Sequence, residues 1–343
     1  MLHCVYYNTL MTFVRYFNIK DIPGIIDFIK QECTVEKGQT IHVSGATSFV
    51  FMKQLEEALG VNLVLYFEVQ YQINWVLYMN KVNSLKDFII PYDPTVEEEA
   101  IKMFSQEGQT KYAGSKSWLE REKLQYPFMM VNVGSTNVSY TIKEDGSISN
   151  HETFWDQGKI FQVLTTLLTG KNSMDEIFAM ARKGKSQNVD FGMADIFNMA
   201  SNAGVTEKME KVKPSESDAG SIFFMGKIAN DLENIDEYRK EDIVASMLRM
   251  WMASLATSLI LKARNENVKQ VVLYASFIDV DIVRDTFIKC MTARNIEQLQ
   301  MYGKEPVEYL FLENGSFAGC LGNMVAPVHD KPFKDQPIGF YWT

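Results

Sequence analysis

Apolar and polar residues alternate along this chain in blocks whose spacing predicts strands and helices in turn. Strands are indicated where short apolar runs are bounded by turn-forming residues, and helices where apolar residues recur at three- and four-residue steps. One such helical set consists of Phe49, Met52, Leu55 and Leu59. The elements expected in the first third are a strand at 12–16, a helix at 22–31, a strand at 40–44, a helix after Gly45 and a largely buried helix at 67–79.

The same alternation continues through the rest of the chain. Further strands are expected at 128–133, 138–142, 268–274 and 309–312. Further helices are expected at 159–168, 174–182, 241–265 and 280–294, with a short helix near the C-terminal end. Polar, glycine-bearing segments at 105–123 and 202–221 predict a surface excursion and a loop or linker. Strands that alternate with helices indicate the α/β fold class.

The stretch Tyr126–Ser139, YPFMMVNVGSTNVS, carries the most chemical information. An apolar strand runs into a turn of Gly134, Ser135 and Thr136, and a second strand follows. Phosphate-binding loops are commonly built in this way, because a glycine lets backbone N–H groups approach an anion. A Gly-Ser pair is also common in ordinary strand turns, so the turn alone does not assign a nucleotide site.

Composition and charge narrow the function classes. The chain has 343 residues, 46% of them hydrophobic and 22% charged, as in an ordinary globular protein. Its net charge of −9 argues against a nucleic-acid partner. The four cysteines and four histidines are scattered without metal-ligand spacing, so no metal site is expected and a reduced, cytoplasmic setting fits. Charges at Arg15, Lys20 and Asp21 interrupt any apolar leader, and no membrane-length segment or membrane partner is expected.

Five segments together resemble one known family. They are TFVRYFNIKDIPGIIDFI (12–29), YPFMMVNVGS (126–135), FQVLTTLLTGKNSMDEIFAMARKG (161–184), EDIVASML (241–248) and FLENGSFAGCLG (311–322). Through them the chain is similar to the eukaryotic-type, or type II, pantothenate kinases, which belong to the superfamily of sugar kinases, actin and heat-shock chaperone ATPases. The resemblance covers residues 12–324. Its most distinctive combination is LLTG followed by an Asp-Glu helix and a Lys/Arg-Gly pair.

The resemblance implies two RNase H-like lobes with ATP in the cleft between them and a dimer formed through the second lobe. It also implies ATP-dependent phosphorylation of pantothenate, the first committed step of coenzyme A synthesis, with ATP and magnesium as cofactors if the chain is active. Residues 1–125 are expected to form an incomplete first lobe that lacks the opening phosphate-binding strands. Residues 126–343 are expected to form a complete RNase H-like lobe.

The chain departs from this family at the positions that carry its chemistry. The glycine-rich strand-turn-strand of the form D-I-G-G-T, which holds the nucleotide phosphates in the family, has no counterpart before residue 12. The family's G-G-G-A-[YF]-K-[FY]-E stretch aligns with residues 45–52, so Met52 stands where the glutamate base belongs. A thioether cannot accept the proton of the pantothenate hydroxyl. The nearest carboxylate is Glu56, and Met52 is otherwise typical of a core position.

Further departures occur at the loop before the LLTG helix and at later motifs. The family's arginine at this loop is Asn150 here, and of the three glycines in its Ser-Leu-Gly-Gly-Gly-Thr-Phe turn only Gly158 survives. Asp156 adds negative charge where the family binds anionic groups. The positions of a second arginine, of a His-Glu-Gly motif and of two paired asparagines are occupied by Asp279, by Asn314-Gly315-Ser316 and by Ala253-Ser254.

No catalytic residue and no metal ligand is therefore assigned. The positions that the resemblance marks for nucleotide or substrate binding are Gly45, Gly134, Ser135, Ser139, Gly158 and Gly319. Glu68 matches an acidic position of the family and is interpreted either as functional or as a surface charge. Lys159 is interpreted as a solvated lysine rather than as a phosphate ligand.

Losses at reactive positions beside a preserved apolar framework indicate a pantothenate kinase-like protein that is catalytically weak or inactive. We expect a pseudokinase subunit linked to coenzyme A biosynthesis that forms a homodimer, or a heterodimer with an active pantothenate kinase. The alternative is a diverged but active kinase that uses Glu56 or Glu68, and a gene start upstream of Met1 would favour this alternative. ATP, pantothenate and acyl-CoA are the candidate ligands.

The expected dimer helix is 241–265, as in the family. An apolar stripe on this helix recurs at three- and four-residue steps and therefore occupies one face. The stripe consists of Leu248, Trp251, Leu255 and Leu259. The alternative interpretation is that this stripe packs on the chain's own sheet.

Overall fold

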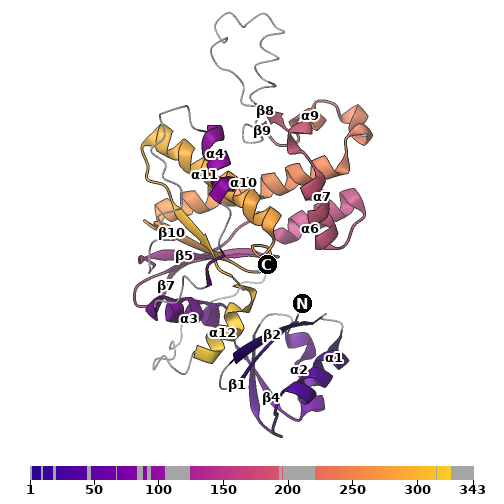
Figure 1. Cartoon of the computed structure of the whole chain (residues 1–343), viewed down its shortest axis with the longest axis vertical. Coiled ribbons are helices and arrows are strands. Elements are labelled where there is room, and N and C mark those ends of the chain that lie inside the picture. Colours follow the sequence, from indigo (N-terminus) through magenta and orange to yellow (C-terminus); the bar gives the residue numbers. More distant parts are fainter. Residues whose placement is uncertain are drawn as a thin grey trace, which may run out of the picture. The chain divides into compact units, whose positions relative to one another are not determined.

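In this computed structural model, the described residues are 2–8, 11–17, 21–44, 48–66, 68–82, 88–90, 94–104, 124–192, 195, 221–313 and 315–325. The chain forms two compact units, and the elements of each are labelled in Figure 1. Unit 1 comprises Met1–Leu85 with Asn314–Thr343, and unit 2 comprises Lys86–Glu313. These units do not coincide with the expected halves 1–125 and 126–343, and the division into lobes stays a prediction.

Unit 2 is built on a five-stranded sheet. Its strands are β5 (Phe128–Val133), β6 (Asn137–Ile142), β7 (Ile148–Thr153), β10 (Gln270–Tyr274) and β11 (Glu308–Phe311), in the order β11-β10-β5-β6-β7. β6 pairs antiparallel with β5 and with β7, while β10 runs parallel to both β5 and β11. A three-stranded meander extended by two parallel strands in this order is the sheet of an RNase H-like lobe. The predicted α/β, RNase H-like fold class is confirmed.

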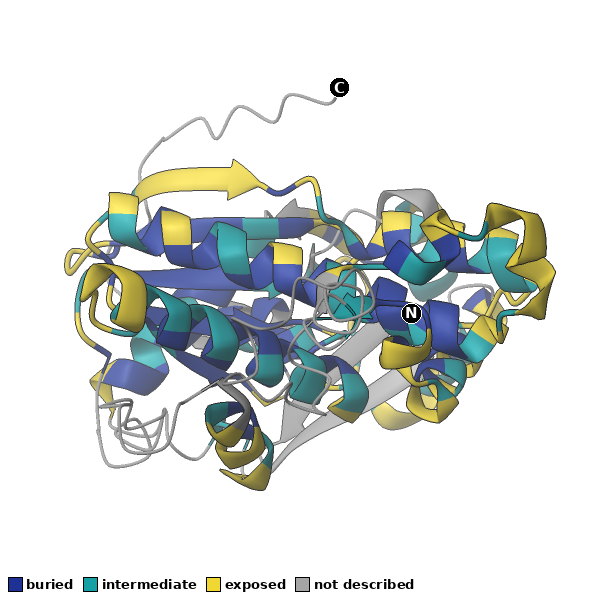
Figure 2. Ribbon diagram, turned by 90° about the horizontal axis from the view of Figure 1, so that it is seen from above, coloured by how far each residue is buried: buried dark blue, intermediate teal, exposed yellow. Residues whose placement is uncertain are grey.

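Apolar sequence accounts for the centre of this sheet and polar sequence for its edge. β5 and β10 are buried along nearly their whole length, which is typical of strands covered on both faces. The edge strand β7, with the sequence ISNHET, is exposed (Figure 2). Its His151 and Glu152 are the kind of polar or charged side chains that protect a sheet edge from pairing with another chain.

Helices cover the sheet of unit 2 and complete its core. They are α4 (Pro94–Phe104), α6 (Gly158–Thr169), α7 (Met174–Lys183), α9 (Gly226–Ala229), α10 (Lys240–Asn265) and α11 (Asp281–Tyr302), with the 3-10 helices η2 (Ser186–Asn188) and η5 (Leu232–Glu237) and the short strands β8 (Phe191–Gly192) and β9 (Ser221–Phe223). α10 packs against α11, α7 and α6, and α11 packs against α4. Side chains of α10 and α11 join those of β5, β10 and β11 in one hydrophobic core.

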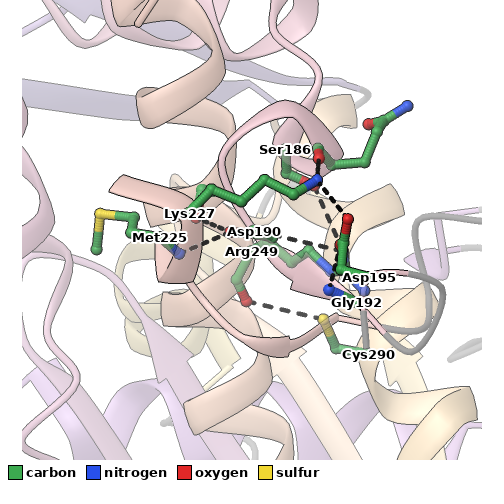
Figure 3. A network of polar contacts seen from close by, with 10 residues as sticks. Ser186, Asp190, Gly192, Asp195, Met225, Lys227, Arg249 and Cys290 are labelled. Carbon is green, nitrogen blue, oxygen red and sulfur yellow. Dashed lines mark hydrogen bonds and ion pairs between the residues drawn. The ribbon is translucent and has the colours of Figure 1, made fainter. Parts of the chain in front are cut away.

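A buried ion pair anchors α10 to the segment after α7 (Figure 3). The Asp190 carboxylate lies 3.6 Å from Nη1 of Arg249, which belongs to α10. This carboxylate also accepts the N–H of Met225 at 2.9 Å and a hydrogen bond from the hydroxyl of Ser246. Because the Asp190 side chain is fully buried, these partners offset the desolvation of its charge. Removing one of them would leave a poorly compensated buried group.

Unit 1 contains two small sheets and the helices around them. Its elements are β1 (Leu2–Asn8), β2 (Met11–Phe17), α1 (Ile22–Glu32), β3 (Thr40–Ser44), α2 (Ser48–Leu59), β4 (Asn62–Tyr66), α3 (Glu68–Lys81), η6 (Gly315–Phe317) and α12 (Ala318–Val325). β1 and β2 form an antiparallel hairpin, whereas β3 and β4 are parallel and are joined by α2. α3 and α12 pack so closely that a Cβ on Gly322 would lie 1.6 Å from the carbonyl oxygen of Tyr71.

Most of the expected elements are present in the described residues. The elements that were not expected include β1, β4, β7 and α4. β7 is polar after its first residue, Ile148, and therefore lacks the alternating apolar signal of a half-buried strand. The hairpin of β1 and β2 contains no glycine between residues 2 and 17, so it is not a glycine-rich phosphate-binding segment. The expected loops at 105–123 and 202–221 lie outside the described residues, apart from Ser221 in β9.

The long helix α10 is a core helix of unit 2. Among the described residues, α10 is the one helix whose length and apolar composition would allow it to cross a membrane. No such segment was expected from the sequence. However, 67% of the most apolar stretch of this helix is buried inside the protein, as in a core helix. The stripe formed by Leu248, Trp251, Leu255 and Leu259 is buried in the same core. The expectation that this stripe is the dimer face is therefore corrected, because the chain's own residues cover it.

Leu255→Ala is expected to lower the free energy of unfolding by about 2–5 kcal/mol, because it leaves a cavity in a closely packed core. Leu261→Ala is the matched control, since Leu261 lies on the same helix with 59% of its surface exposed. A change within about 0.5 kcal/mol is expected for this control. Urea denaturation followed by circular dichroism measures both variants. Equal and small losses would show that the stripe does not belong to the core.

Candidate functional site

The candidate site lies at the carboxyl ends of β5 and β10. These strands are parallel, with Tyr274 of β10 paired with Asn132 of β5, so the segments that follow them start side by side. In open α/β sheets, ligands bind outside the carboxyl ends of the strands. Three segments meet here: the turn 134–136 after β5, residues 154–158 between β7 and α6, and residues 275–279 after β10.

The first turn of α6 is hydrogen-bonded to the turn after β5. The N–H of Gly158 donates to the carbonyl oxygen of Gly134 at 3.2 Å, and the N–H of Lys159 donates to the carbonyl oxygen of Ser135 at 3.0 Å. The first N–H groups of a helix normally have no intrahelical partner and are therefore available to an anion. In this chain two of these groups are occupied by the turn.

Close packing leaves no room for a side chain at Gly158. A Cβ at this position would lie 2.2 Å from the ring of Phe277 and 2.4 Å from the carbonyl oxygen of Gly134. Any side chain would therefore push α6 away from the turn. Phe277 in turn packs edge-on against Trp251 of α10, with 5.5 Å between the ring centroids. The close approach accounts for the glycine, and its part in ligand binding stays a prediction.

Asn137 fixes the turn, and sequence reasoning missed it. Its side chain is fully buried. The amide oxygen accepts the N–H of Gly134 at 3.2 Å, and the amide nitrogen donates to the carbonyl oxygen of Asp156. The indole N–H of Trp251 donates to the same carbonyl oxygen at 2.7 Å. Asparagine is common beside turns, so only its inward position on a buried strand could have signalled this role.

Asp156, in the segment between β7 and α6, carries a half-buried carboxyl group. Burial raises the pKa of Asp156 to about 6, against a smaller lowering by a hydrogen bond with Ser254. Within the described part of the chain, Oδ2 of Asp156 has no hydrogen-bond partner. Above this pH the group is charged and disfavours an anionic ligand. Asp156 and Ser254 both occupy positions where the chain departs from the resembled family, so two departures contact each other.

Ala275 gives the segment after β10 a strained backbone. Its φ is +88°, a conformation that glycine adopts freely and that costs other residues on the order of 1–3 kcal/mol. The side chain of Phe277, two residues later, lies between Gly158 and Trp251. This packing keeps the strained segment in place beside the turn.

Asn150, at the position of the family's arginine, lies away from the turn. It is three residues along β7 from Thr153, which corresponds to about 10 Å. Its amide nitrogen donates to Oε1 of Glu266 at 2.7 Å, and Lys262 contacts the same oxygen at 2.8 Å. Burial raises the pKa of Glu266, but hydrogen bonds with Lys262, Thr141 and Asn150 lower it further than burial raises it. The position now belongs to a polar network at the end of α10.

Of the other predicted binding positions, only Ser135 lies at this site in an exposed place, in the turn itself. Ser139 is fully buried in β6, and among the described residues its hydroxyl has no hydrogen-bond partner. Gly319 is buried in α12 of unit 1. Gly45 lies outside the described residues. The roles of these four residues in binding stay predictions.

The position of the family's base lies in unit 1. Met52 on α2 is partly buried against the small hydrophobic core of that unit. Glu56, one turn further on, accepts the N–H of Leu63 in β4 at 2.8 Å. Glu68 is half-buried at the start of α3, where it accepts a hydrogen bond from Gln72 at 3.0 Å. Burial raises the pKa of Glu68.

The residues described at the candidate site do not fit the phosphates of a nucleoside triphosphate. Two N–H groups at the start of α6 already serve the turn, and the nearby carboxyl of Asp156 disfavours phosphate. Lys159 is exposed, and its ammonium group donates to the Gln162 side chain at 3.1 Å. Across the described residues, no three His, Cys, Asp or Glu side chains could together hold a metal ion.

Comparison with known proteins places this chain among pantothenate kinase relatives. The family model Fumble matches residues 5–326. The chain is 24% identical over 283 residues to "Pantothenate kinase 2" of Arabidopsis thaliana, covering 82% of this chain and 27% of that protein. It is 25% identical over 224 residues to "Pantothenate kinase 1" of the same plant, covering 65% and 54%. It is also 25% identical over 226 residues to "4'-phosphopantetheine phosphatase" of Mus musculus, covering 63% and 24%. The chain thus spans between about a quarter and about half of the length of these relatives.

Solved structures of sugar kinases show a more distant likeness. A glucokinase of the ROK family from Streptomyces griseus is 10% identical with a TM-score of 0.38, covering 91% of this chain and 90% of that one. A glucokinase from Leishmania braziliensis is 13% identical with a TM-score of 0.32, covering 76% and 64%. The fold class therefore rests on the strand order of unit 2.

Asp156→Asn is expected to stabilise the fold at pH 8 and to have no such effect at pH 4. Folding raises the pKa of this carboxyl from 3.8 to about 6, so the folded state holds the proton more tightly. Stability therefore falls as the pH rises from about 4 to above 6. An amide avoids this loss, which amounts to about 1 kcal/mol once the remaining solvent contact is discounted. Thermal denaturation at several pH values measures it.

Asp145→Asn is the control, because the pKa of Asp145 is shifted in the opposite direction to that of Asp156. Hydrogen bonds from the hydroxyl and the N–H of Ser147 lower the pKa of Asp145. Its charged form therefore contributes stability above the unfolded-state pKa, and this contribution is lost as the pH falls. The Asp145→Asn variant should therefore show no gain in stability at pH 8. An effect of Asp156→Asn that does not change with pH would contradict the assigned ionisation.

Proposed function

Because this chain belongs to the pantothenate kinase family described by the Fumble model, we propose that it is a catalytically weak or inactive member that pairs with an active pantothenate kinase. Its link to coenzyme A metabolism follows from the family. The proposed role is that of a regulatory or structural subunit, and the proposed location is the cytoplasm. Free Cys33 and Cys290 are compatible with a reducing compartment.

The observation that carries this proposal is the occupied start of α6. Phosphoryl transfer depends almost entirely on positioning and on charge stabilisation by N–H groups, cations and metal ions. Here the N–H groups of Gly158 and Lys159 donate to the turn after β5, and Asp156, two residues before Gly158, carries a half-buried carboxyl group. This environment supports a site that no longer stabilises transferring phosphate.

The position of the general base supports the same proposal. Met52 stands at the family's glutamate position and packs partly into the core of unit 1. A thioether does not take up a proton at neutral pH, and loss of a general base typically lowers a rate by about 10²–10⁴-fold. Glu56 is a poor substitute, because its carboxylate is engaged by the N–H of Leu63.

ATP and magnesium are the cofactors of an active kinase with this fold. The residues described at the candidate site of unit 2 do not fit the phosphates of ATP. Nucleotide, pantothenate or acyl-CoA binding without turnover is compatible with a regulatory subunit. Such binding would use contacts other than the N–H groups of Gly158 and Lys159.

A second candidate function, a diverged but active pantothenate kinase, is favoured by Glu68. This carboxyl is half-buried, and its pKa is raised by burial, as is common for groups that act as general bases. Its hydrogen bond with Gln72 would orient it. Under this alternative, Glu68→Gln abolishes activity while Met52 tolerates substitution.

The purified chain is expected to phosphorylate pantothenate undetectably or at least about 10²–10⁴-fold more slowly than an active family member, since the base is missing. A radiolabelled pantothenate assay with magnesium and ATP measures this rate. Addition of the chain to an active pantothenate kinase from the same cell is expected to change that enzyme's kcat or KM, because the two pair. An active kinase alone is the reference.

Two results would contradict the proposal. One is turnover by the purified chain at a rate typical of enzymes, with Met52→Ala equally active. Loss of that turnover in Glu68→Gln would then establish the second candidate. The other is the absence of any complex with an active pantothenate kinase at micromolar concentrations, which would remove the pairing role.

A further inference from the structure

The carboxyl group of Asp156 differs from two other largely buried carboxylates of unit 2. Asp190 is paired with Arg249 and accepts two further hydrogen bonds, and Glu266 is paired with Lys262. Among the described residues, Asp156 forms no ion pair, and its Oδ2 is shielded from solvent without a hydrogen-bond partner. Buried charges in proteins are normally paired or coordinate a cation.

A second unpartnered oxygen lies on the strand β6. Ser139 is fully buried, and within the described part of the chain its hydroxyl has no hydrogen-bond partner. Buried polar groups are nearly always satisfied, so an orphan hydroxyl of this kind calls for an explanation such as a bound ion or water.

The side chain of Ser139 is on the face of β6 that is turned toward α10. Alternation along a strand puts Asn137, Ser139 and Thr141 on one face. The amide of Asn137 and the indole of Trp251 on α10 share one carbonyl oxygen as acceptor. Thr141 donates to Glu266 at the C-terminal end of α10. β6 and α10 therefore run in the same direction across this face, with Ser139 between its two contacts.

The two unpartnered oxygens lie on the same side of the shared carbonyl oxygen, which belongs to Asp156. Ser139 is two residues beyond Asn137, about 7 Å along β6. Ser254, to which the Asp156 carboxyl is hydrogen-bonded, is three residues beyond Trp251, about 4.5 Å along α10. One carboxyl group and two hydroxyl groups thus gather between facing elements.

The lysines of neighbouring segments are engaged elsewhere. The ammonium group of Lys159 donates to Gln162 at 3.1 Å. Lys262 contacts Glu152 at 2.9 Å and Glu266 at 2.8 Å. Neither lysine therefore neutralises the carboxyl group between β6 and α10.

We propose that Asp156, Ser139 and Ser254 bind one monovalent cation, sodium or potassium, and that water completes its coordination. Hard cations take oxygen ligands of this kind. A single carboxylate balances one positive charge, whereas a divalent ion would leave an excess charge in a half-buried place. Ser254 is exposed, which gives the ion a path from solvent.

This inference stands apart from the proposed loss of catalysis. Cation binding is measured without ATP, pantothenate or a partner kinase, and it concerns a carboxyl group rather than phosphoryl transfer. A chain that binds the cation and turns over pantothenate would contradict only the proposed function. A chain that does neither would contradict only the cation site.

Thermal denaturation of the full-length chain at pH 8 tests the proposal in potassium, sodium or choline chloride at equal total chloride. Choline is the reference, because it is too large for the site. A ligand that binds only the folded state stabilises it in proportion to the logarithm of its concentration. The melting temperature is therefore expected to rise by about 2–5 °C for each tenfold increase above the dissociation constant. The ion with the larger response is the one that the site prefers.

Asp156→Asn is expected to abolish this response, because it removes the charge that holds the ion. In choline chloride the variant should be at least as stable as the wild type at pH 8, so a lost response does not reflect a damaged fold. The wild type should also lose its response at pH 4, where the carboxyl is protonated. Asp145→Asn is the matched control and should respond like the wild type, since Asp145 is an exposed carboxylate outside the site.

Ser139→Ala separates a ligand from a structural hydroxyl. In choline chloride the variant should not be less stable than the wild type, because an unpaired buried hydroxyl is lost. In the preferred salt its apparent dissociation constant for the cation should rise about two- to tenfold, because one oxygen ligand is missing. Ser149→Ala is the control: its hydroxyl already donates to the carbonyl oxygen of Thr141 at 3.3 Å, so the cation response should not change.

Sodium NMR relaxation reports binding directly. The wild type is expected to broaden the sodium signal, with potassium competing, and Asp156→Asn is not. Three outcomes would overturn the proposal. They are equal melting temperatures of the wild type in all three salts, an equal cation response in the wild type and Asp156→Asn, and a response that is lost in Asp145→Asn as well.

Discussion

Two backbone hydrogen bonds, from the N–H groups of Gly158 and Lys159 to the carbonyl oxygens of Gly134 and Ser135, determine the character of the candidate site. They bring the start of α6 onto the turn after β5. The close approach requires a glycine at 158, because a Cβ would collide with Phe277 and with the turn. The free N–H groups that would attract an anion are consumed by this contact.

The departures from the family are connected in space. Asp156 contacts Ser254, and its carbonyl oxygen is held by Asn137 and Trp251. Burial raises the pKa of the Asp156 carboxyl to about 6, and in its charged form this group disfavours an anionic ligand. We interpret Asp156 and Ser254 as one coupled change rather than as two unrelated substitutions. The strained backbone of Ala275 lies on the same edge of the sheet.

The sequence predicted the parts of the fold that have a strong apolar signal. β5, β6, α6 and α10 are present at their expected positions, because buried strands and amphipathic helices leave a readable period. β7 left no such signal, since it is polar and exposed. In the site, Gly134 and Gly158 were recognised by resemblance, but the bonds between their segments are long-range contacts that no local pattern encodes. The sequence allowed the α10 stripe to be either a dimer face or a core face, and the packing of unit 2 shows that it is buried in the core.

Amide hydrogen exchange at Gly158 and Lys159 tests the central claim most directly, because it reports whether these N–H groups are bonded to the turn or available to a ligand. The account predicts strong protection in the free protein that does not change when magnesium, ATP and pantothenate are added. Fast exchange in the free protein that slows on addition of magnesium and ATP would contradict the account, since the start of α6 would then be an open phosphate site.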